Sequence, residues 1–192
     1  MKIKEVFDEI IVGYNQTNAT IDDNYSKIYK TLHKDSIQYT NIITSKLIDK
    51  AFSSNIKKKY FVQGRDILIF VKKPYRVGTC IKSDLPEIVI PNNFIILRGI
   101  NIEKYSYIFV ANYLEKIGID KYIEDNKFLG NLKIDNVKEI ELPDISKEKQ
   151  MTISPLLNAI NERSAIYSNI LDNDDKIINY AINSITGDKN DK

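Results

Sequence analysis

The residues of this chain that could carry out nucleophilic or metal chemistry are few and widely separated. Among 192 residues there is one histidine, His33, and one cysteine, Cys80. One histidine builds neither a Ser-His-Asp triad nor a zinc site, and Cys80 lies in an apolar run, where a buried, unreactive thiol is expected. The sequence therefore predicts no catalytic nucleophile and no metal.

Two further classes of site are also missing from the pattern. The seven glycines are scattered, so no glycine-rich phosphate loop is formed. The acidic residues at 22–23 and at 172, 174 and 175 lie in a loop-like stretch and on a helix surface, where carboxylates are normally solvated. The sequence thus predicts no cofactor, and it favours a recognition module over an enzyme.

Basic residues are concentrated in one part of the chain. Residues 46–82 contain ten Lys and Arg against two acidic residues, although the net charge of the whole chain is only +2. The aromatic residues Tyr60, Phe61 and Tyr75 are interleaved with them, and phosphate contacts and base stacking use these residue types. We expect a nucleic-acid surface here; the alternatives are a solvated face or AT-rich codon usage that inflates the lysine content.

The first 145 residues have the pattern of an irregular α+β domain with mixed and antiparallel strands. Short β-branched and aromatic runs predict strands at 67–71, 78–81, 88–90 and 94–97. Helical spacing predicts a helix over 105–117 that ends at Gly118. Residues 3–11 suit either a short helix or a strand.

Residues 146–186 predict a long C-terminal helix, followed by a frayed tail at 187–192. Steps of four and three repeat along it, which is the heptad spacing of a helix that pairs with another helix. The stripe comprises Ile153, Leu157, Ile160, Ser164, Tyr167, Leu171, Asp174, Ile178, Ala181 and Ile185. Because Pro155 is tolerated only in a first turn, we expect the helix to begin near Ser154 or to kink there.

A helix of this length cannot cover its own apolar stripe. The alternatives are that it folds back onto its own domain or that a second helix, from another chain, pairs with it. The length favours pairing, through the apolar residues Ile153, Leu157, Ile160, Tyr167, Leu171, Ile178 and Ile185.

The sequence gives no sign of membrane insertion or export. Its longest apolar runs are a few residues, against the roughly 20 needed to cross a bilayer. The N-terminus is acidic at Glu5, Asp8 and Glu9 and has no continuous apolar segment. We expect a cytoplasmic protein.

An ordered series of segments resembles a known family. It begins with 60–69, reading YFVQGRDILI, and continues through 76–80, the strand 94–98, the helix around 107–114 and the turn 130–131. Residues 132–134 then lead to a Leu-Pro pair at 142–143, Gln150 and an apolar helix. In this order the series resembles the target-recognition domain and following helix of type I restriction-modification specificity (S) subunits, over almost the whole chain.

The resemblance implies a function without catalysis. It implies a DNA target-recognition domain at 1–145 and a helix at 146–186 that pairs antiparallel with a second copy, so that a homodimer reads an interrupted palindrome in double-stranded DNA. The chemistry would belong to separate adenine methyltransferase subunits and, in the full complex, to a restriction subunit. Typical S subunits carry two domains and two helices, so this chain resembles a half-subunit, and Arg65 separates the family's Gly-Asp pair.

Ten residues are the candidates for DNA contact under this interpretation. They are Lys57, Lys58, Lys59, Lys72, Lys73, Tyr75, Arg76, Arg98, Lys127 and Asn131. Each has a structural alternative: Tyr75 could cap the turn after Pro74, Arg98 could pair with a carboxylate, and 130–131 could be only a tight turn. Two other functions stay open, a non-catalytic decoy or regulator that binds methyltransferase subunits and a general protein-interaction module.

Overall fold

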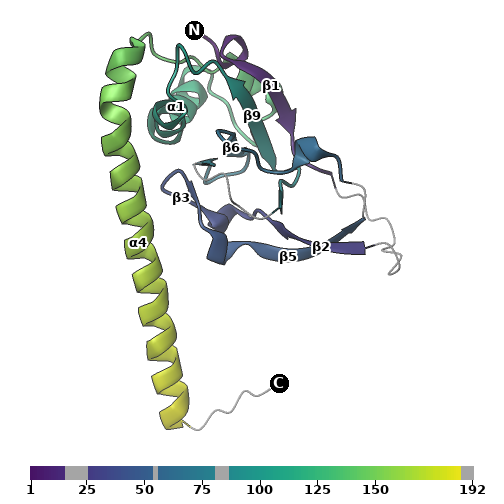
Figure 1. Cartoon of the computed structure of the whole chain (residues 1–192), viewed down its shortest axis with the longest axis vertical. Coiled ribbons are helices and arrows are strands. Elements are labelled where there is room, and N and C mark those ends of the chain that lie inside the picture. The colour runs from purple at the N-terminus through teal and green to yellow at the C-terminus, as the bar shows by residue number, and fades with distance from the viewer. Residues whose placement is uncertain (16–25, 54–55, 81–86, 187–192) are drawn as a thin grey trace.

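A strand-rich domain with one long helix along its side makes up the chain (Figure 1). The computed structural model describes residues 1–15, 26–53, 56–80 and 87–186. The predicted tail at 187–192, the acidic pair 22–23 and the end of the predicted strand 78–81 lie outside these residues.

The main sheet has six strands, with β6 and β9 at its centre. Its order is β1 (Phe7–Val12), β9 (Phe94–Ile100), β6 (Ile67–Phe70), β7 (Arg76–Thr79), β4 (Asn41–Ile42) and β3 (Ile37–Gln38). All neighbours are antiparallel except β4 and β7. Every residue of β6 is buried, which explains why this strand is an uninterrupted apolar run.

A second, three-stranded sheet lies beside the first. Its order is β5 (Ile48–Ser53), β2 (Ser26–Thr31) and β8 (Ile88–Val89). The strands β2 and β5 form an antiparallel ribbon, which β8 joins only at Lys30 and Thr31. Tyr29 and Phe52 pack inward from this ribbon against Val89.

Helices cover the other face of the main sheet. The segment α1 (Tyr107–Tyr113) continues through a π-turn, η6 (Leu114–Gly118), into α2 (Ile119–Asp125), and α3 (Ile134–Glu139) follows. The short 3-10 turns are η1 (Ile3–Glu5), η3 (Lys34–Ser36), η4 (Thr44–Lys46) and η5 (Lys58–Tyr60).

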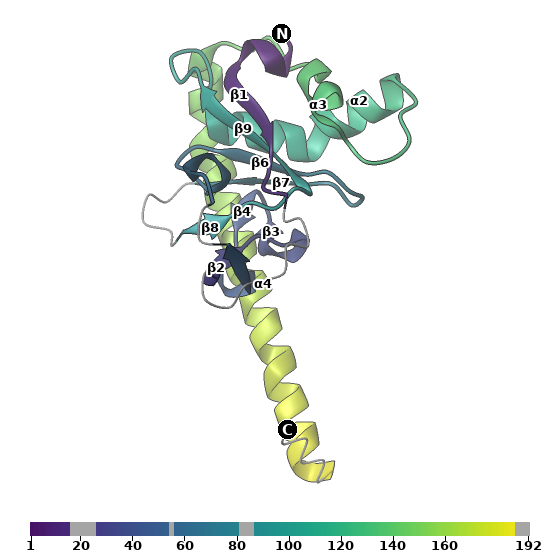
Figure 2. The same ribbon diagram turned by 90° about the vertical axis from the view of Figure 1, so that its right-hand side faces the viewer.

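The strands of the main sheet alternate between two cores. Ile67 and Ile69 of β6 pack with the helices, including Val110 and Leu114. Leu68 and Phe70 point the other way, towards β8 and the second sheet. The domain therefore has three layers, with the helices and the second sheet on opposite sides of β6 (Figure 2).

The four predicted strands are present as β6, β7, β8 and β9, although β7 begins at Arg76 and β9 extends to Ile100. Residues 3–11 contain both η1 and β1. The predicted helix stop at Gly118 is wrong, because Gly118 has helical backbone angles and the chain continues into α2. A Cβ at this position would lie 2.8 Å from Tyr113 Cε1, so the glycine makes room for the tyrosine ring.

The final helix is α4 (Lys147–Thr186). Its predicted start near Ser154 is wrong, since it begins at Lys147 and Pro155 lies inside it. Figure 1 shows α4 as one unbroken helix without a sharp kink along its length. A proline within a helix removes one backbone donor, and the side chains of Gln150 and Ser154 beside it are buried against the domain.

The predicted stripe of α4 remains largely exposed to solvent. The exposed fraction of its large apolar side chains ranges from 40% for Ile160 and 41% for Ile153 to 86% for Ile185. Leu157 is the exception and is half-buried. The helix does pack on its own domain, through a different and polar face that includes Gln150, Ser154 and Asn161. Pairing through the apolar stripe stays a prediction. No helix among the described residues is long and apolar enough to span a membrane.

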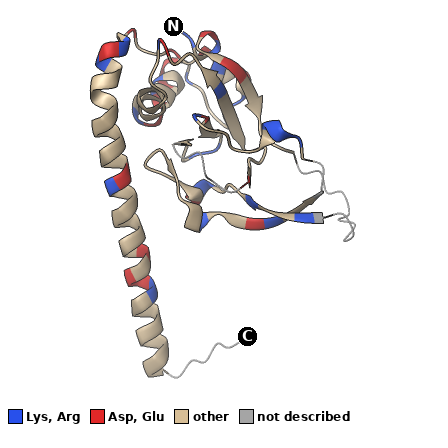
Figure 3. Cartoon of the chain, viewed as in Figure 1, with Lys and Arg blue, Asp and Glu red and all other residues tan. Residues whose placement is uncertain are grey.

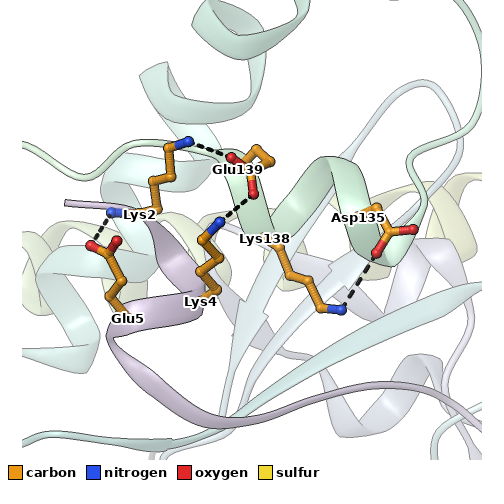
Figure 4. Close-up of polar contacts among 6 residues, drawn as sticks. All are labelled: Lys2, Lys4, Glu5, Asp135, Lys138 and Glu139. Atoms are coloured by element: carbon orange, nitrogen blue, oxygen red, sulfur yellow. Dashed lines mark hydrogen bonds and ion pairs between the residues drawn. The ribbon is translucent and has the colours of Figure 1, made fainter.

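An ion-pair network fastens the N-terminus to α3 (Figure 4). Glu139 accepts hydrogen bonds from the ammonium groups of both Lys2 and Lys4, and the backbone N–H of Ile3 donates to the carbonyl of Ile140. The two lysines lower the pKa of Glu139 from 4.5 to about 2. This contact ties η1, which precedes β1, to the C-terminal end of α3.

The depressed pKa predicts acid sensitivity. Because the folded-state pKa lies below 4.5, the contribution of Glu139 to stability is fully present above about pH 4.5 and is lost as the pH falls towards 2. We expect Lys2→Ala to raise the pKa of Glu139, measured by NMR titration of its carboxyl carbon. Lys138→Ala is the control, because Lys138 pairs with Asp135 instead; an equal effect of the two variants would contradict the assignment.

Candidate nucleic-acid interface

The predicted DNA-contact residues lie at two places on opposite ends of β6. Arg76 pairs with Phe70 at one end of this strand, whereas Arg98 follows Leu97, the partner of Ile67, at the other. We call the surface at the first end the hairpin patch. The surface at the other end, which lies around Arg98 and also includes two lysines that were not predicted, is the η5 patch. The hairpin patch comprises Lys72, Lys73, Tyr75, Arg76, Lys127 and Asn131. The η5 patch comprises Lys27, Lys50, Lys57, Lys58 and Lys59.

The hairpin patch joins two loops that are distant in sequence. Tyr75, in the β6–β7 turn, donates a hydrogen bond from its Oη to the Gly130 carbonyl at 2.6 Å, and the backbone N–H of Leu132 donates to the Val71 carbonyl. Gly130 has a φ of +120° and lies in a bend of the chain, a backbone conformation that favours glycine. The structure thus brings Lys72 and Lys73 together with the loop 127–131.

Acidic residues surround part of the hairpin patch. A cleft of about 610 Å³ beside Lys73 and Tyr75 is also lined by Glu115, Asp120 and Glu124. Glu115 accepts a hydrogen bond from the Val77 N–H at 2.6 Å, and burial raises its pKa. The potential at this end of β6 is therefore mixed, which weakens its attraction for a polyanion.

The η5 patch surrounds a cluster of aromatic rings. Tyr14 contacts Phe52 and Tyr60, and Tyr29 contacts Phe52 and Phe61. Lysine ammonium groups lie over three of these rings: Lys27 over Tyr29 at 4.6 Å, Lys59 over Tyr60 at 5.1 Å and Lys50 over Phe52 at 5.8 Å. Cation–π contacts of this kind hold lysines in place without neutralising their charge, although Lys27 also pairs with the carboxylate of Glu87 at 3.2 Å.

Three lysines of the η5 patch were predicted from the sequence and two were not. Lys57, Lys58 and Lys59 are exposed on and before η5, and Figure 3 shows basic residues on this turn and on the β2–β5 ribbon. Lys27 and Lys50 were missed as site residues. They lie opposite Phe52 and Tyr29 in the ribbon, and only a predicted β2–β5 register could have revealed the shared face.

Arg98 pairs with a carboxylate, as one of its two predicted roles requires. Its guanidinium donates to both carboxylate oxygens of Asp66, at 2.8 and 2.7 Å, and Asp66 is fully buried. It also donates to the carbonyls of Lys59 and Phe61. Arg98 therefore holds the chain of η5 in place, and four of its hydrogen bonds are made within the domain.

The chemistry available to this surface is the binding of anions. The exposed ammonium groups can meet phosphates, and the neighbouring rings offer faces for stacking. Among the described residues, no group of three or more His, Cys, Asp or Glu side chains could hold a metal ion. The surface fits recognition of a polyanion.

Comparison with known proteins identifies the fold. No family model matches the sequence, and no curated protein is similar to it in sequence. The structure is similar to the HsdS subunit from Thermoanaerobacter tengcongensis, with a TM-score of 0.59 and 15% identity over 96% of this chain and 47% of that one. It is also similar to a chain from a structural study of complex assembly and conformational transition in a type I R-M system. There the TM-score is 0.55 and the sequence identity 13%, over 96% of this chain and 48% of that one.

The resemblance seen in the sequence is therefore confirmed at the level of the fold. The chain has the α+β architecture with a long C-terminal helix found in HsdS specificity subunits of type I restriction-modification systems. It spans about half the length of the chains that it matches.

The Arg98 network predicts a large loss of stability on truncation. Arg98→Ala leaves the carboxylate of Asp66 buried without its cation, and we expect the free energy of unfolding to fall by about 3–5 kcal/mol. Arg76→Ala is the matched control, because Arg76 lies 3.8 Å from Glu115 but is exposed, and we expect a change below about 1 kcal/mol. Denaturant titration measures both; similar losses would contradict the role given to Arg98.

Proposed function

We propose that this chain is the DNA sequence-recognition subunit of a type I restriction-modification system. In this proposal it acts as a homodimer, reads an interrupted palindrome and directs separate adenine methyltransferase and restriction subunits. The observation that carries the proposal is the match of nearly the whole chain, domain and helix together, to half of an HsdS subunit.

Pairing through α4 would supply the missing half. The helix carries an exposed stripe of large apolar side chains and has no charged residue from 177 to its end at 186. Burial of such a stripe against a second copy is the favourable outcome in water. An antiparallel pair would place one recognition domain near each end, and twofold symmetry then requires two identical, inverted half-sites.

DNA would be held by the basic surfaces of the domain. The lysines of the η5 patch would contact phosphates, which position the protein without reading sequence, and polar side chains in neighbouring loops would read base edges. Carboxylates lie beside both surfaces: Glu87 pairs with Lys27 of the η5 patch, and Glu115, Asp120 and Glu124 line the cleft at the hairpin patch. Among the described residues, Lys57, Lys58 and Lys59 form no ion pair and are exposed. The η5 patch is therefore our first candidate for phosphate contact.

Methylation mapping tests the proposal. The chain is co-expressed with the adenine methyltransferase subunit of its own system, and methylated adenines are mapped across the host genome. We expect a palindromic, interrupted motif that appears only when both proteins are made. Co-purification without methylation would instead support the decoy or regulator, and failure to associate would contradict the proposal.

The pairing stripe has a matched control on the same helix. Leu171→Glu with Ile178→Glu places charges in the apolar stripe, and we expect the dimer to dissociate and methylation to be lost. Asn169→Glu with Asn173→Glu adds the same charges to a different face of α4. Light scattering measures the mass; a dimer that survives the first pair of substitutions would exclude this stripe.

The contributions of the two basic patches to DNA binding are distinguished by neutralising each patch in turn. Changing Lys57, Lys58 and Lys59 to Gln removes three charges, and at about 0.9 per phosphate contact we expect the slope of log affinity against log salt to fall by roughly 2.7. The comparison variant changes Lys72, Lys73 and Arg76 to Gln. Titration of duplex DNA at several salt concentrations measures both; an equal or larger effect of the second variant would move the phosphate contacts to the hairpin patch.

A further inference from the structure

The face of α4 that lies on the domain is polar, whereas the adjacent face is apolar and exposed. Gln150, Ser154 and Asn161 are its buried residues. At 100° per residue, this face is centred about a quarter-turn or slightly more from the apolar stripe. The helix thus meets its own domain through hydrogen bonds and leaves most of its large apolar side chains exposed.

The first point of attachment is at the N-terminus of α4. Gln150 Oε1 accepts from the Ser106 N–H at 3.0 Å, and its Nε2 donates to the Ile145 carbonyl. The hydroxyls of Ser106 and Ser154 lie 2.6 Å apart. Lys147 donates to the carbonyls of Ile102 and Tyr105. We call this set the latch.

The second point of attachment lies farther along the helix, at the β3–β4 turn. Asn161 Nδ2 donates to Thr40 Oγ1 at 2.6 Å and to Asn112 Oδ1 at 2.9 Å. Ser168 Oγ donates to Gln38 Oε1 at 2.9 Å. Lys46 pairs with Asp172 at 2.6 Å. We call this second set the clamp.

The turn that carries the clamp is strained. Tyr39 and Thr40 have φ values of +51° and +57°, in the left-handed region that glycine and asparagine normally occupy in two-residue hairpins. A β-branched residue there costs free energy and persists only where its surroundings fix it. Thr40 is held by Asn161 on one side and by the Thr79 N–H, which donates to its carbonyl, on the other.

The latch and the clamp, at two separate places along α4, together fix the direction of the helix relative to the domain. Ser154 and Ser168 are 14 residues apart, or about 21 Å along the helix axis, and the last clamp residue, Asp172, leaves about 21 Å of helix beyond it. The latch alone would leave α4 attached at one end. The clamp therefore determines the angle between α4 and the recognition domain.

We propose that the clamp is a specificity-determining device that sets the spacing between the two half-sites. The inference rests on the proposed function, because in a dimer paired through α4 the angle at each end determines how far apart, and in which rotation, the two domains meet DNA. One base pair of spacer changes the separation by about 3.4 Å and the rotation by roughly 35°. A rigid clamp selects one spacer length.

The first test measures the angle without DNA. Spin labels are attached to Lys34→Cys in the domain and Asn183→Cys near the end of α4, in a Cys80→Ala background, and they report the distance between the two positions. An excess of unlabelled chain dilutes contacts between labelled copies. We expect one narrow distance in the parent and a distribution about twofold broader in Asn161→Ala with Ser168→Ala, because the helix then swings on the latch. Asn169→Ala with Asn173→Ala is the control, with no clamp bond removed.

The second test measures spacer choice by methylation mapping. We expect the parent to modify one spacer length, and the clamp variant to raise methylation of sites one base pair longer or shorter by about tenfold, the equivalent of ~1.4 kcal/mol. An unbroadened distance, or a broadened distance with unchanged spacer choice, overturns the proposal. If the double variant does not fold, Ser168→Ala alone removes one partly exposed clamp bond and serves in both tests.

The two tests keep the two proposals apart. If the parent chain directs no methylation, the proposed function fails. The distance measurement then decides by itself whether the clamp sets the direction of α4. A narrow distance in every variant would reject the clamp even if the parent methylates DNA at an interrupted palindrome.

Discussion

The hydrogen-bonded contact between α4 and the recognition domain is the constraint on which the arrangement of the molecule depends. Burying polar side chains is costly unless each finds a partner. Gln150, Ser154 and Asn161 are buried and bonded, so only one register of the helix on the domain satisfies them. An apolar interface would tolerate sliding or rotation more easily, because hydrophobic contact has no preferred direction. The polar face therefore decides where the apolar stripe points.

Inside the domain, too, apolar residues form the core and buried polar contacts position the surface. Apolar strands such as β6 and β9 supply the buried core, while a buried ion pair places the surface. Arg98 and Asp66 lie beneath η5, and their hydrogen bonds to the carbonyls of Lys59 and Phe61 fix the turn that presents the lysines. Removing the guanidinium would leave the buried carboxylate of Asp66 without its cation. The lysine-bearing turn thus gains its shape from Arg98, whose side chain has little exposure.

Periodic apolar patterns made the strands β6, β8 and β9, the helix after Ser106 and the stripe of α4 predictable from the sequence. Errors arose where a tertiary contact overrides a local preference. Gly118 signals a helix end, yet it makes room for Tyr113, and Pro155 lies inside α4. The clamp residues of α4 could not be predicted, because Asn and Ser on a helix are compatible both with contact to water and with contact to the domain. Lys27 and Lys50 join the η5 patch only because β2 and β5 pair in one register, and a single sequence does not specify that register.

Under the proposed function, twofold symmetry makes the rigidity of the clamp more consequential than it would be in a monomer. Because the two chains are identical, a change in the mean angle between the domain and α4 is present at both ends of the pair. DNA resists compensating for it, since bending or twisting a short duplex costs free energy. Each of the two chains carries the strained Tyr39-Thr40 turn, and in each chain the turn contributes to a fixed angle between the domain and α4. This favours retaining the strain at the clamp instead of replacing it with a relaxed, glycine-containing hairpin.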